Sequence, residues 1–74
     1  MVDEGIIKNA THYGTVGYVG LLGDISWAIL ELPSGCVATV YIHKKGVKQK
    51  VAERETLDKS YNAIANWINH AEET

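Results

Sequence analysis

The segment Ile25–Leu32, ISWAILEL, lies between two turn signals and is rich in apolar residues. Side chains alternate between the two faces of a strand, so Ile25, Trp27 and Ile29 share one face. The opposite face is also apolar and takes Ala28, Leu30 and Leu32. Two apolar faces are typical of a strand that is covered on both sides or belongs to a small closed barrel. The segment therefore predicts the centre of a sheet.

Three turn signals divide the surrounding chain into short extended runs. Gly23-Asp24 suits a two-residue hairpin turn, because glycine readily adopts the positive φ that such a turn needs. Pro33-Ser34-Gly35 and Lys44-Lys45-Gly46 suit two further turns. We therefore expect an antiparallel meander, with strands at about residues 13–22, 25–32, 36–43 and 47–52. In the last run valines alternate with lysines, a pattern that favours an edge strand.

The remaining segment has the pattern of an amphipathic helix, uninterrupted by Gly or Pro from Thr56 onward. Thr56 is suited to cap this helix, and Asp58 lies favourably in its first turn. Apolar side chains recur at helical spacing, namely Leu57, Tyr61, Ile64, Ala65 and Ile68, with Trp67 and Ala71 at the margin. This stripe needs an apolar partner, which the sheet supplies. The predicted fold is α+β: a four-stranded antiparallel meander, strongly coiled or barrel-like in its alternative form, covered by one C-terminal helix.

The length of 74 residues allows one domain. We expect an irregular N-terminal arm at residues 1–11 and a single β-meander-plus-helix domain at residues 12–74. No apolar run approaches the roughly 20 residues of a membrane helix, and no secretory signal pattern is visible. The single cysteine, Cys36, forms no intramolecular disulfide and fits a reducing compartment. These features predict a soluble, cytoplasmic protein with no membrane partner.

Glycine occupies every third position of the stretch GTVGYVGLLG, residues 14–23. A phosphate-binding loop would lead into the N-terminus of a helix, whereas this stretch leads into the strand pattern of ISWAILEL. Collagen requires many more repeats and proline within them. On a strand, these glycines favour either a bend or bulge, or a surface left bare for a partner.

The charge distribution is uneven although the formal net charge is only −2. Six of the seven basic residues fall between Lys44 and Lys59. A lysine-bearing hairpin can contact phosphates or an acidic protein, or it can simply keep an edge strand soluble. No aromatic residue is interleaved among these lysines, so the spacing gives no support for base stacking. The candidate partner-binding residues are Lys44, Lys45, Lys48, Lys50, Arg54 and Trp67, the last because tryptophan is enriched at binding hot spots.

The residues that carry chemistry are scattered. His12, His43 and His70 occur singly, and Cys36 has no partner at the spacing of a zinc site. No serine lies in a nucleophile motif such as GxSxG. We therefore expect no metal, no cofactor and no enzymatic activity.

By elimination, the sequence predicts a protein-interaction module that occupies the surface of another protein, as small accessory or inhibitor proteins of phages and mobile elements do. Nucleic-acid binding through the Lys44–Lys50 hairpin is the alternative. Self-association into a homodimer would help so small a core. In outline, the arrangement resembles the DNA-binding modules of some phage integrases and plant transcription factors, which read DNA with basic, aromatic-bearing strands. The corresponding stretch GYVGLLGDISWAILEL contains no arginine, so no residue roles are transferred from that family.

Overall fold

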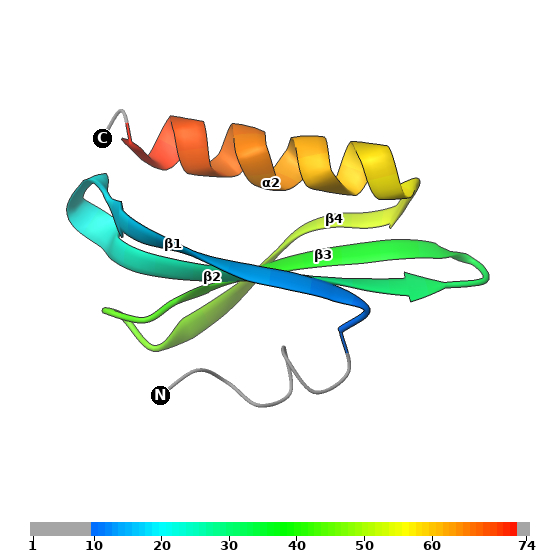
Figure 1. Cartoon of the computed structure of the whole chain (residues 1–74), viewed down its shortest axis with the longest axis horizontal. Coiled ribbons are helices and arrows are strands. Elements are labelled where there is room, and N and C mark those ends of the chain that lie inside the picture. The colour runs from blue at the N-terminus through cyan, green and yellow to red at the C-terminus, as the bar shows by residue number, and fades with distance from the viewer. Residues whose placement is uncertain (1–9, 73–74) are drawn as a thin grey trace.

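A computed structural model describes residues 10–72 of the chain. The elements are the strands β1 (His12–Val19), β2 (Gly23–Leu32), β3 (Gly35–Ile42) and β4 (Val47–Glu55), the 3-10 helix η1 (Gly20–Leu22) between β1 and β2, and the C-terminal helix α2 (Leu57–Glu72). The strands form one antiparallel sheet in the order β1-β2-β3-β4, and α2 lies across one of its faces (Figure 1). The predicted α+β meander with one covering helix is confirmed.

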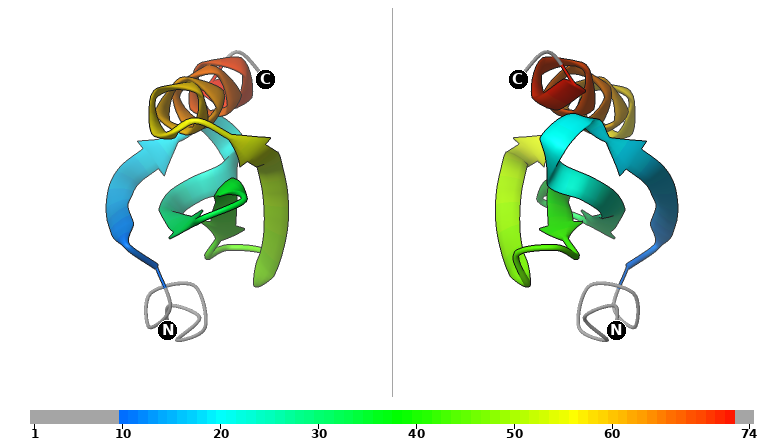
Figure 2. Two further views of the ribbon diagram at one scale, coloured as in Figure 1. Left: turned by 90° about the vertical axis from the view of Figure 1, so that its right-hand side faces the viewer. Right: turned by 90° about the vertical axis from the view of Figure 1, so that its left-hand side faces the viewer.

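The sheet is twisted but open. Figure 2 shows β1 and β4 on opposite sides of the molecule, with α2 above them and β2 and β3 between them. The two outer strands do not pair with each other, so the barrel-like alternative is wrong. β2 is a central strand, as predicted, and β4 is an edge strand, as predicted.

The hydrophobic core lies between α2 and one face of the sheet. Buried and half-exposed residues alternate regularly along β3, which shows that one of its faces is covered. Val51 and Ala52 of β4 pack against this core and are partly buried. The buried residues of its two clusters come from the other three strands and α2: Val19, Ile25, Ile29, Cys36, Ala38, Val40, Ile42, Ile64 and Ala71. Trp27 packs against both halves of this core and joins them. Cys36 is therefore a packing residue.

The start of α2 follows local sequence chemistry. The Thr56 side-chain oxygen accepts a hydrogen bond from the Lys59 backbone N–H at 3.2 Å, so the predicted N-cap is confirmed. Asp58 lies in the first turn, where a negative charge interacts favourably with the helix dipole.

The buried stripe of α2 is rotated from the predicted one. Ser60, Ile64 and Ala71 are its buried residues, whereas Tyr61 and Ala65 are exposed. The Tyr61 ring lies at the margin, edge-on to the Trp27 ring with 5.6 Å between centroids. The small Ser60 therefore lets the helix approach the sheet, while the larger tyrosine closes the side of the core.

Two of the three predicted turns are confirmed, at Pro33-Ser34 and at Lys44-Lys45-Gly46, where Gly46 has φ +68°. The turn predicted at Gly23-Asp24 is wrong. β1 ends at Val19, and the reversal uses η1 between Gly20 and Gly23, whose φ values are +49° and +76°. Two glycines in left-handed conformations reverse the chain here, so Asp24 lies within β2.

The glycines of β1 have two different roles. The register with β2 shifts between Val16 and Val19, so the predicted bulge is confirmed and Gly17 lies within it. Gly14 lies against the indole of Trp27, where an added Cβ would be only 2.7 Å from a ring carbon. Gly17 thus belongs to a bulge, and Gly14 makes room for the Trp27 indole.

This difference predicts unequal effects of alanine. Gly14→Ala should lower the free energy of unfolding by about 1–3 kcal/mol, because the methyl group displaces the Trp27 ring. At Gly17 the nearest atom to an added Cβ is an Asp24 carboxylate oxygen at 3.8 Å, so Gly17→Ala should change stability by no more than about 0.5 kcal/mol. Urea denaturation of both variants measures the difference; equal effects would contradict the close packing at Gly14.

Most of the predicted N-terminal arm, residues 1–9, lies outside the described residues. Thr11, its last residue, is attached to β2: its N–H and hydroxyl both donate to the Ile29 carbonyl, at 2.9 and 3.0 Å. Its hydroxyl oxygen also accepts the Glu31 N–H at 3.0 Å. Hydrogen bonding to β2 therefore includes Thr11, one residue before β1.

Candidate interaction surface

The face of the sheet that α2 does not cover carries two complete rows of side chains. Paired residues of antiparallel strands point to the same side. The register therefore forms one row from Thr15, Ser26, Tyr41 and Lys48, and a second from Tyr13, Ala28, Thr39 and Lys50. Along β3 these residues alternate with Val40 and Ile42, which are buried beneath α2. We call these eight residues the outer face.

The two rows have similar chemistry. Each contains one tyrosine, at least one hydroxyl side chain, and a lysine on β4. Tyr13 is 60% exposed and both lysines are exposed, whereas Ser26 and Ala28 at the centre are buried. Within residues 10–72, no helix or strand lies over this face. The outer face is therefore a polar and aromatic surface with basic side chains along one edge.

The β3–β4 turn extends the basic edge. Lys44 and Lys45 are exposed on this turn, and the Lys44 ammonium lies 3.5 Å from the Leu21 carbonyl of η1. Lys50 pairs with Glu53 at 3.1 Å, but both side chains are about half exposed, and surface pairs of this kind contribute little stability. The structure thus brings together four of the six predicted contact residues.

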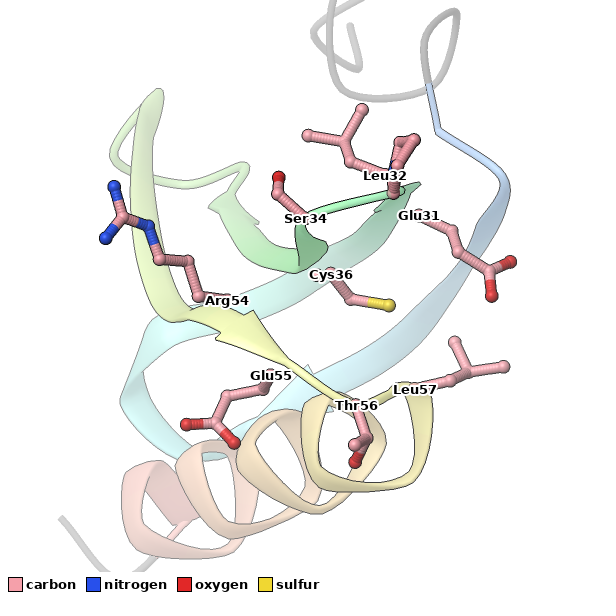
Figure 3. A pocket seen from close by; sticks show the side chains of 10 residues that line it. Glu31, Leu32, Ser34, Cys36, Arg54, Glu55, Thr56 and Leu57 are labelled. Carbon is pink, nitrogen blue, oxygen red and sulfur yellow. The ribbon is translucent and has the colours of Figure 1, made fainter.

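Arg54 lies apart from these lysines, at the far end of β4. It is the extra residue of a bulge, with φ +59°, and it lines an open depression of about 350 Å³ between the β2–β3 turn and the start of α2. Figure 3 shows its guanidinium directed away from Cys36, which lies at the centre of the depression. Arg54 and the four lysines therefore do not form one surface.

Trp67 is also remote from the outer face. It is half-buried on α2 and packs against the core cluster of Val19, Ile25 and Val40. Trp67 therefore contributes to the packing of α2 on the sheet. Its role as a partner contact stays a prediction.

A hydrogen-bonded group on the outer face was not predicted. The Ser26 hydroxyl lies 2.6 Å from Nε2 of His43 and 3.2 Å from the Thr15 hydroxyl. The Tyr41 ring packs edge-on against the His43 ring, with centroids 5.0 Å apart. Ser26 is only 2% exposed, so these bonds connect β1, β2 and the β3–β4 turn and give the outer face a fixed shape.

Among residues 10–72, no three side chains of His, Cys, Asp or Glu gather where they could hold a metal ion. No helix in this range is long and apolar enough to cross a membrane. Comparisons with protein-family models, with curated proteins and with solved structures found no match.

Proposed function

We propose that this chain is a protein-interaction module whose contact surface is the outer face together with the β3–β4 turn. One observation carries the proposal: α2 buries one face of the sheet, while the other presents two tyrosines and two lysines held in fixed register.

The chemistry of this surface indicates the kind of partner. Tyrosine supplies a large contact area at low cost in conformational entropy and is enriched at binding hot spots. Lysines at the rim favour an acidic partner, because complementary charge speeds encounter and excludes wrong orientations. The partner is therefore a protein with an acidic surface that fits a twisted sheet.

A matched pair of variants tests the proposal. Lys48→Gln/Lys50→Gln removes two positive charges from the outer face, and Arg54→Gln/Lys59→Gln removes two from the other end of the molecule. Both sets of side chains are exposed. A tagged wild-type protein should recover a specific partner from its host lysate, and the control variant should recover it equally well. The outer-face variant should lose it. Loss with the control variant alone would contradict the placement of the contact surface.

Nucleic-acid binding is the second candidate. No aromatic residue lies among the lysines at residues 44–50 in the sequence, but the strand register places a tyrosine beside a lysine. Tyr41 lies directly opposite Lys48, whereas Tyr13 and Lys50 stand at the two ends of one row, on β1 and β4. A tyrosine ring beside a lysine can stack on a base while the ammonium contacts the backbone phosphate. The outer face therefore has the elements of a single-strand binding surface.

Fluorescence anisotropy with a labelled single-stranded oligonucleotide tests this candidate. Binding through the outer face should weaken with salt, and each lysine changed to Gln should reduce the slope of log K against log salt by about one. Tyr41→Ala should weaken binding by about 1–3 kcal/mol for each base that stacks on it. Unchanged binding after replacement of Lys44, Lys45, Lys48 and Lys50 would exclude the outer face and the β3–β4 turn as a nucleic-acid site.

A further inference from the structure

The two edges of the sheet differ in their protection against another strand. β4 carries five charged residues among nine, from Lys48 to Glu55. Such charges discourage pairing with further strands, whereas a register shift is present in both edge strands. β1, HYGTVGYV, contains no Lys, Arg, Asp, Glu or Pro. At the edge of a sheet, such a strand presents backbone N–H and C=O groups that another strand can bind.

We infer that β1 pairs with β1 of a second copy of the chain, in antiparallel orientation. This inference goes beyond the proposed function, because it uses the edge of the sheet and not the outer face. An uncharged strand meets no like charges when it pairs with itself, which distinguishes β1 from β4. Tyr13, within β1, is 60% exposed, and Leu21, in η1 directly after β1, is 74% exposed, so apolar area is available at this edge.

The glycine spacing selects a register for the pair. A two-fold axis perpendicular to the sheet keeps the faces of both copies aligned, so a residue can pair only with one on its own face. Centring the axis on Thr15 places Tyr13 beside Gly17 of the second copy, and Val16 beside Gly14 of the second copy. Gly17 has only the Asp24 carboxylate oxygen within 4 Å of an added Cβ. The space above it can therefore receive a tyrosine ring.

The pair would extend the proposed contact surface. Because the axis keeps both outer faces on one side, four strands from each copy would form a continuous eight-stranded sheet. Both α2 helices would lie on the other side. The basic edges formed by β4 would then lie at the two ends of the assembly.

A disulfide tests the register directly. In this pairing the two Thr15 Cα atoms would be about 4.5–5.5 Å apart, within the range that a disulfide spans. Thr15→Cys should therefore form a covalent dimer under mild oxidation. Ser34→Cys, on the exposed β2–β3 turn, is the matched control and should form no covalent dimer. Cys36 is buried in both variants, so the wild type should not cross-link. Equal cross-linking of the two variants would overturn the inference.

Light scattering at increasing protein concentration tests the interface without a cross-link. The wild type should become dimeric, and so should Ser34→Lys/Asn66→Lys, which adds two charges elsewhere. Tyr13→Lys/Gly17→Lys should stay monomeric, because it places like charges opposite each other across the pair. A wild type that is monomeric at every concentration, or a dimer that persists with lysines in β1, would overturn the inference. Partner binding by a monomeric wild type would contradict this inference and leave the proposed function standing.

Discussion

Gly35→Ala is expected to destabilise the protein by about 3 kcal/mol or more, a loss that would leave much of a domain of this size unfolded. Gly35 has φ +126°, a conformation that residues with a Cβ rarely adopt. An alanine Cβ would also lie 2.8 Å from the Arg54 Cα. The Cβ is fixed to the backbone of β3, and the atoms that it meets belong to the backbone of β4. The clash can therefore be relieved only by shifting one strand against the other. Urea denaturation followed by circular dichroism measures the loss.

Gly46→Ala is the control for this prediction. Gly46 also has a positive φ, +68°, but the nearest atom to an added Cβ is the Tyr41 hydroxyl at 3.9 Å. The variant therefore carries the backbone cost alone, about 1–2 kcal/mol. If both glycine variants lost the same stability, the contact between β3 and the bulge at Arg54 would not add to the loss caused by Gly35→Ala, which would contradict the prediction.

Ile64→Ala is expected to have the second large effect, a loss of about 2–5 kcal/mol. Ile64 is 4% exposed and is the buried residue that α2 contributes to the cluster with Ile29, Cys36 and Ala38. Its removal leaves a cavity between helix and sheet, at the centre of a core that is small to begin with. Thermal unfolding of this variant should shift to much lower temperature.

The exposed residue Asn66 provides the matched control on the same helix. Asn66→Ala should be neutral or slightly stabilising, because alanine has the higher helix propensity. If this variant lost as much stability as Ile64→Ala, helix formation itself would be the limiting factor, and the packing of α2 on the sheet would not explain the result.

The parts of the fold that depend on local chemistry could be predicted from the sequence. The turns at residues 33–35 and 44–46 and the cap at Thr56 each involve neighbouring residues, and the structure places all of them as expected. The first turn differs from the expected Gly23-Asp24 hairpin, because the chain reverses through η1, which begins at Gly20. The stripe of α2 was misjudged at Ser60 and Tyr61, because hydrophobicity alone does not indicate how closely the helix approaches the sheet.

The candidate site depends on long-range register, which the sequence does not reveal directly. The lysines of the β3–β4 turn were predicted because they are adjacent in the chain. The contacts across the outer face join different strands: Tyr41 lies opposite Lys48, and Ser26 is hydrogen-bonded to His43. The predicted turn at residues 33–35 sets the register of β2 with β3. Together with the alternation of side chains along these strands, it could have indicated that Ser26 and His43 share a face.

The central claim is that the covering helix shields one side of the sheet and leaves the tyrosine- and lysine-bearing side accessible. Nuclear magnetic resonance with a soluble paramagnetic probe measures this along β3. Signals from Thr39 and Tyr41 side chains should be broadened, while those from Val40 and Ile42 should be protected. Equal protection of both sets would contradict the account, because neither side of the sheet would then be free to bind.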